Sequence, residues 1–192
     1  MTHQVYAFEP PERFVAGTVG QPGERTFYLQ ASGQGRVVSV ALEKVQVSLL
    51  AEKLDELLGE AHRRFGLVLP ELGAVTQDND PLDTPVDEEF RVGTLGLAYD
   101  VETATVVIEA IAVGEGEAEA EVEDEVDESE IDVEEETADL DRLRVRLTPA
   151  ATRDFIERAK RVLAAGRPPC PLCGQPLDPK GHLCPRHNGY HR

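Results

Sequence analysis

The sequence predicts an α+β fold in which an antiparallel sheet carries a long amphipathic helix and a second, C-terminal helix. Two observations predict this class. The first is a set of short alternating apolar runs separated by turn residues. The second is a stretch with helical periodicity that has such runs on both sides of it. Strands, then a helix, then strands are typical of a sheet with helices on one face rather than of a doubly wound fold. With 41% apolar residues among 192, the chain can build one core.

Three strands are expected near the N-terminus, at residues 13–19, 25–31 and 36–42, with glycine-rich turns between them. Alternate side chains of a strand point to opposite faces, and the second and third runs alternate in this way. One face of the sheet is therefore predicted to be buried. Its expected residues are Phe27, Leu29 and Ala31 in the second run and Val38, Val40 and Leu42 in the third.

A long helix is expected from Glu43 to about Gly66, because apolar residues there recur at spacings of three and four with charged residues between them. The glycine suits the end of the helix. The apolar positions are Val45, Leu49, Leu50, Leu54, Leu57, Leu58, Ala61 and Phe65.

Two later runs, at residues 90–100 and 103–113, predict a hairpin around Asp100. The stretch 140–148 alternates three apolar residues with Arg142, Arg144 and Arg146, which predicts one more strand in the same sheet. Thr148 followed by proline is typical of a helix start, and the second helix is expected to end at Gly166.

The net charge of −18 is divided unevenly along the chain. Residues 1–113 carry 8 bases and 18 acids and are expected to form an α+β domain; residues 114–139 carry 15 acids and no base. Such uncompensated carboxylates predict a disordered, low-complexity linker or insertion. Residues 140–192 carry 11 bases and 4 acids. Within them, 140–166 is expected to complete the domain and 167–192 to form a separate small unit.

This last unit holds every cysteine of the chain, in the pattern of a metal site. Cys170 and Cys173 form C-x2-C, and Cys184 and His187 form C-x2-H, ten residues later. Three thiolates and one imidazole make a closed tetrahedral shell, which is typical of structural Zn²⁺. His182 is the alternative fourth ligand. The sequence thus predicts a zinc knuckle, and the competing interpretation is a small apolar cluster of reduced cysteines.

The sequence resembles an uncharacterised protein family found in actinobacteria. The resemblance rests on the segments "GERTFYLQA", "RVVSVALEK" and "GRPPCPLCGQPLDPKGHLCPRHNGY". It implies an actinobacterial, cytosolic protein, and it implies no catalytic residue, substrate or partner.

No sequence motif predicts an enzyme. The cysteines are assigned to zinc, and no nucleophile elbow or phosphate-binding loop is present. Asp78, Asp80 and Glu89 match three positions of a calcium loop, but Asp83 stands where that loop requires glycine. Catalytic sites assembled by the fold leave no such signal. An enzyme with a pocket between the sheet and the first helix therefore remains the alternative function.

The favoured function is a non-enzymatic binding or adaptor protein whose basic C-terminal surface docks an acidic protein or a nucleic acid. Only two aromatic residues follow residue 139, so stacking on bases is poorly supported and an acidic protein is the preferred partner. No membrane segment, secretion signal or small-molecule substrate is indicated, and the expected location is the cytoplasm. The proposed contact residues are Arg142, Arg144, Arg146, Arg158, Lys160, Arg161 and Arg186.

Overall fold

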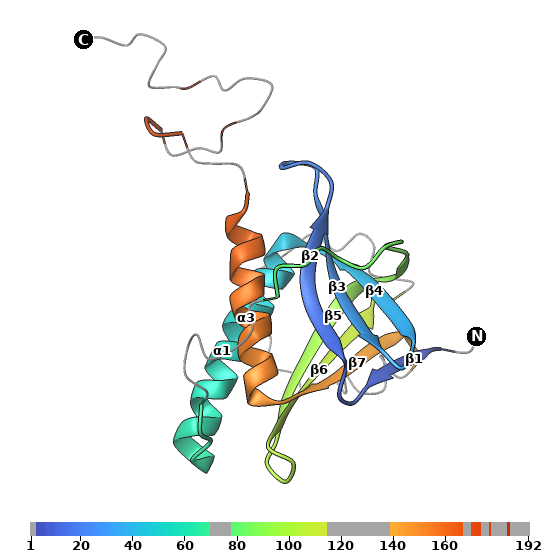
Figure 1. Cartoon of the computed structure of the whole chain (residues 1–192), viewed down its shortest axis with the longest axis vertical. Helices are drawn as coiled ribbons and strands as arrows, with labels where there is room; N and C mark the ends of the chain where they lie inside the picture. The colour runs from blue at the N-terminus through green and yellow to red at the C-terminus, as the bar shows by residue number, and fades with distance from the viewer. Residues whose placement is uncertain are drawn as a thin grey trace.

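The computed structural model describes residues 3–69, 78–114, 139–166, 170–173, 177 and 184. It confirms the α+β class (Figure 1). In chain order the elements are β1 (Val5–Phe8), β2 (Arg13–Val19), β3 (Thr26–Gly33), β4 (Arg36–Leu42), α1 (Lys44–Phe65), β5 (Glu88–Asp100), β6 (Thr105–Ala112), β7 (Arg142–Leu147) and α3 (Pro149–Ala164).

The seven strands form one sheet in the order β1-β7-β6-β5-β4-β3-β2. Of the six strand pairs described, four are antiparallel, as the sequence predicted, and two are parallel, so the sheet is mixed. Strands β4 and β5 are parallel, because α1 intervenes between them and carries the chain back to the end of the sheet where β4 began. Strand β1, which the sequence did not predict, pairs in parallel with β7.

The sheet curves so strongly that its two edges approach each other. Strands β1 and β2 are the two edges, yet they follow one another in the chain. The amide of Glu12, between them, donates to the carbonyl of Ser32 on β3 at 2.8 Å. Gly33 permits this approach, since a Cβ there would lie 3.3 Å from the ring of Phe8 on β1. Figure 1 shows the curved sheet on one side and α1 and α3 side by side on the other.

The main core lies between the concave face of the sheet and the two helices. All six side chains expected on the buried face of the second and third strands are buried. In α1 the buried face is narrower than the apolar pattern, because Val45 is 71% exposed and Leu49 is 50% exposed. The buried residues of that helix are Val47, Leu50, Ala51, Leu54, Leu58 and Ala61.

The ends of both helices follow local sequence signals. The side-chain oxygen of Gln46 accepts a hydrogen bond from the amide of Glu43 at the start of α1, at 2.8 Å. Gly66 ends that helix with φ of 67°, a conformation that favours glycine. In α3 the hydroxyl of Thr148 accepts from the amide of Ala151 at 3.2 Å, and Pro149 occupies the first turn, as predicted.

The second face of the sheet is also buried at β3 and β4, which the alternating pattern did not predict. Gln30 and Ser39 are buried there, and the Gln30 amide donates to the Ser39 hydroxyl and to the carbonyl of Asp83, both at 3.0 Å. The Asp83 amide returns a hydrogen bond to Gln30 at 2.8 Å. The segment before β5 therefore covers this face, and it satisfies the polar groups that it buries.

No helix in the parts of the chain that are described is long and apolar enough to cross a membrane.

Candidate metal centre

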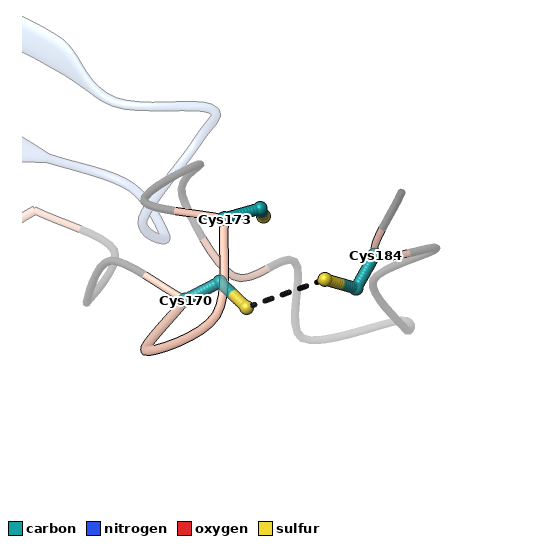
Figure 2. Close-up of side chains that lie close together, drawn as sticks. All are labelled: Cys170, Cys173 and Cys184. Atoms are coloured by element: carbon teal, nitrogen blue, oxygen red, sulfur yellow. Dashed lines mark hydrogen bonds between the residues drawn. The ribbon is translucent and has the colours of Figure 1, made fainter. Parts of the chain in front are cut away.

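The three cysteines of the chain lie together. Their Sγ atoms are all within 4.8 Å of one another. Cys170 and Cys173 come from one turn, and Cys184 approaches from a separate part of the chain (Figure 2). Cys170 and Cys184 are buried, at 6% and 7% exposure. The structure thus brings together the three thiols that the sequence assigned to one metal ion.

The spacing of the sulfur atoms suits shared coordination rather than disulfide bonding. The Sγ atoms of Cys170 and Cys184 are 3.9 Å apart, and none of the three cysteines forms a disulfide. Zn–S bonds are about 2.3 Å, so two sulfurs of a regular tetrahedron lie about 3.8 Å apart. The observed separation is close to this value, whereas a disulfide requires about 2.05 Å.

The backbone of the first turn favours a thiolate at Cys170. Amides of Cys173 and Leu172 donate hydrogen bonds to its sulfur and lower the pKa of Cys170 to about 6. Because thiolates are the form that ligates metals, this turn reduces the free energy needed to deprotonate the site near neutral pH. The short C-x2-C spacing creates this geometry, since it folds the backbone amides back toward the first sulfur.

The two candidates for a fourth ligand, His187 and its alternative His182, lie outside the described residues, so the choice between them stays a prediction. The described cysteines form a group of three that could hold a metal ion.

The chain matches the family described as "Protein of unknown function (DUF3090)" over residues 6–184. It belongs to that family. No curated protein and no solved structure matches the chain. The family match contains all three cysteines and His182 and ends before His187. It confirms the predicted membership in an uncharacterised family.

In this family member the predicted basic contact residues fall into separate environments. Arg142, Arg144 and Arg146 alternate along β7 on the face opposite to the core, as the sequence predicted. Arg144 lies 3.1 Å from a carboxylate oxygen of Glu9 and 3.5 Å from one of Glu109. Arg146 lies 2.6 Å from Asp100. Acidic side chains of the α+β domain therefore already pair with Arg144 and Arg146 and offset much of the positive charge along β7.

Arg158 is buried, and it holds two parts of the fold together. Its side chain is 8% exposed and contacts the Asp78 carboxylate at 2.7 Å. Its other nitrogens donate to the carbonyls of Ala16 and Asp80, at 3.0 and 2.6 Å. Arg13 contacts the same carboxylate at 2.6 Å. Sequence analysis missed this cluster, because its members are 65 and 80 residues apart and no motif links them.

The remaining predicted contacts lie on α3 or beyond it. Lys160 is half-exposed, 3.7 Å from Asp55 of α1 and 3.8 Å from Glu157. Arg161 donates to the backbone carbonyl of Asp78 at 3.1 Å. Arg186 lies outside the described residues. Among the residues described, the predicted basic set therefore does not gather into one continuous patch.

Proposed function

We propose that this protein is a zinc-binding, non-enzymatic binding protein of the cytoplasm, in which a structural Zn²⁺ organises the C-terminal unit. The observation that carries the zinc assignment is the close approach of the three cysteine sulfurs. Sulfur-rich donor sets select zinc among the abundant divalent cations, and three thiolates with an imidazole leave no open position for a substrate. The role is therefore structural.

Metal content tests the zinc assignment. Protein purified without added metal should contain about one zinc per chain by elemental analysis, because a structural site of this kind binds zinc tightly. His187→Ala should reduce the zinc content or affinity, whereas His182→Ala should leave both unchanged. The reverse result would identify His182 as the ligand. Absence of zinc from protein refolded with equimolar Zn²⁺ would end the assignment.

The docking partner that we propose is an acidic protein. Residues 140–192 have a net charge of +7, in contrast with −10 for residues 1–113. The ion pairs along β7 do not prevent docking, since the Arg144 side chain is 41% exposed and such pairs contribute about 0–1 kcal/mol. A carboxylate of a partner can replace Glu9 beside Arg144 at little energetic expense.

A charge-removal experiment tests this surface. The double variant Arg144→Gln/Arg146→Gln should bind a fluorescent poly-glutamate peptide several-fold more weakly than the unmodified chain at low salt. Lys53→Gln is the matched control, because Lys53 is also an exposed, paired cation but lies on α1. A labelled single-stranded oligonucleotide distinguishes the nucleic-acid alternative. Equal peptide affinity of the double variant and the control would contradict docking at β7.

A further inference from the structure

A small pocket lies between α3 and the chain that leads into β2. Its volume is about 170 Å³. Four of its residues follow one face of α3 at spacings of three and four, and the rings of Phe14 and Phe155 stack beside it with centroids 4.8 Å apart. Ligand pockets for drug-sized molecules are about 300–1,000 Å³, so this one suits a short chain rather than a nucleotide or cofactor. The α3 residues are Ala151, Asp154, Phe155 and Arg158.

The two arginines of the pocket already form hydrogen bonds with the protein itself. Arg13 donates to both oxygens of Asp78 and to the carbonyls of Asp80 and Pro81, at distances from 2.6 to 3.1 Å. Arg158 donates to Asp78 and to three backbone carbonyls, as far away as Ala16 on β2. Since these donors are engaged, the pocket has little positive charge to offer an anion.

Among the described residues, the Asp154 carboxylate is the acidic group of this pocket that accepts no hydrogen bond. Across the described parts of the chain, no hydrogen bond or ion pair reaches it. The residue one turn later is Arg158, the usual partner for an aspartate on a helix, but Arg158 is directed toward Asp78 instead. Burial raises the pKa of Asp154, and the charge of Arg161 opposes this only in part. The other two acids of the pocket have partners, since Asp78 accepts from both arginines and Glu12 accepts from the amide of Gln34 at 3.1 Å.

We propose that this pocket binds an organic cation, a primary ammonium or guanidinium group on a short aliphatic stem, with Asp154 as its counter-ion. The phenylalanines and Ala151 provide the apolar wall for the stem. The carboxylate provides a charge that an ammonium group matches and a neutral or anionic group does not. Because no described side chain donates to this partly exposed carboxylate, its oxygens can accept hydrogen bonds from a ligand that supplies the donor.

Binding of simple cations tests the site directly. Isotope-labelled full-length protein is titrated with n-butylammonium, with n-butanol and butyrate as neutral and anionic probes of similar size. Amide resonances of residues 11–15 and 151–158 should shift with n-butylammonium and not with the other two. Asp154→Asn should weaken n-butylammonium binding about tenfold, because it removes the charge and keeps the shape.

Two further variants separate this site from general effects. Glu157→Gln on the same helix is the matched control and should leave binding unchanged, because Glu157 is exposed and pairs with Lys160. Ala151→Leu should abolish binding by filling the pocket while the charge of Asp154 remains. Equal binding of butanol and n-butylammonium, or full binding by Asp154→Asn, would overturn the proposal.

A second probe distinguishes a free amine from a basic side chain of a partner protein as the source of the cation. Lysine blocked as its N-acetyl, N-methylamide derivative has the same ammonium stem attached to a peptide backbone. If it shifts the same resonances, the site accepts a basic side chain of a partner protein. If only n-butylammonium does so, the site accepts free amines. Either result supports the cation site, whereas no shift with either compound refutes it.

Discussion

We expect the α+β body (the described residues up to 166) and the cysteine unit (residues 167–192) to be stabilised by different chemistry. The body buries a continuous cluster of aliphatic and aromatic side chains from the sheet and both helices. Residues 167–192 contain three leucines and one tyrosine besides the cysteines, together with six prolines, and Leu172 is 50% exposed. We do not expect a segment of this size and composition to fold by burial alone, so its folding should depend on the proposed Zn²⁺. Each region is therefore expected to respond to a perturbation that leaves the other unchanged.

The largest expected effect is loss of the metal. Cys184→Ser should weaken zinc binding by more than about 100-fold, because even the loss of a group that only supports a ligand weakens binding 10–100-fold. Competition with a chromogenic chelator measures this affinity. The far-ultraviolet circular dichroism of the body should persist, since the cysteines are not among the residues of its core cluster. A collapse of the whole spectrum on chelation would show that the two regions are one cooperative unit.

The reciprocal perturbation acts on the body. Leu54 is fully buried on α1, so Leu54→Ala should lower the free energy of unfolding by about 2–5 kcal/mol. Urea denaturation measures the loss, and zinc affinity should not change. Leu49→Ala on the same helix is the control, since Leu49 is half-exposed and its truncation should have less than about a third of that effect. Similar losses for both variants would contradict the packing of α1.

Local sequence signals predicted most of the body correctly. Residues 13–19 and 36–42 form β2 and β4 with the expected bounds, because alternation and turn glycines act over a few residues. The strand β1 was missed, since it is four residues long and only Tyr6 and Phe8 of it are buried. The parallel pairing of β4 with β5 was also missed, because it depends on the path of the chain across α1.

The two candidate sites also differ in whether local sequence signals could predict them. The C-x2-C spacing indicated the metal cluster, because two of its thiols are neighbours in the chain. The pocket at Asp154 had no such signal. The pocket exists because the Arg158 side chain contacts β2 and Asp78 rather than Asp154 on its own helix. These partners are 80 and 142 residues away in the sequence, so the contacts depend on the fold.

Acid should weaken the body through Asp78, with a moderate effect. Hydrogen bonding by Arg13, with the charge of Arg158, lowers the pKa of Asp78 against the opposing effect of burial. A lowered pKa contributes stability above the unfolded value of about 3.9, and this contribution is lost as pH falls through the folded value. Asp78→Asn should lower the free energy of unfolding by about 1–3 kcal/mol at pH 7, an estimate reduced because Asp78 is partly exposed.

Urea denaturation at several pH values checks this effect. The difference between Asp78→Asn and the unmodified chain should shrink as the pH falls below about 4, because protonation removes the same charge. Zinc removal should not change the difference at pH 7, since Asp78 belongs to the body. A difference that stays constant with pH would show that the carboxylate charge does not hold the two arginines.

The smallest expected effect is a local one at the tip of the β5–β6 hairpin. The guanidinium of Arg146, 2.6 Å away, and the amide of Thr103 lower the pKa of Asp100 to about 2. Arg146→Gln should raise that pKa toward its ordinary value without reaching it, since the amides of Thr103 and Glu102 still donate to Asp100. Carboxyl carbon chemical shifts followed against pH measure the change.

Arg144→Gln is the matched control and should leave the pKa of Asp100 at about 2, because Arg144 faces Glu9 and Glu109 instead. The same pKa with and without zinc would confirm that the electrostatics of the body are independent of the cysteine unit, and a pKa that moves on chelation would connect the two regions.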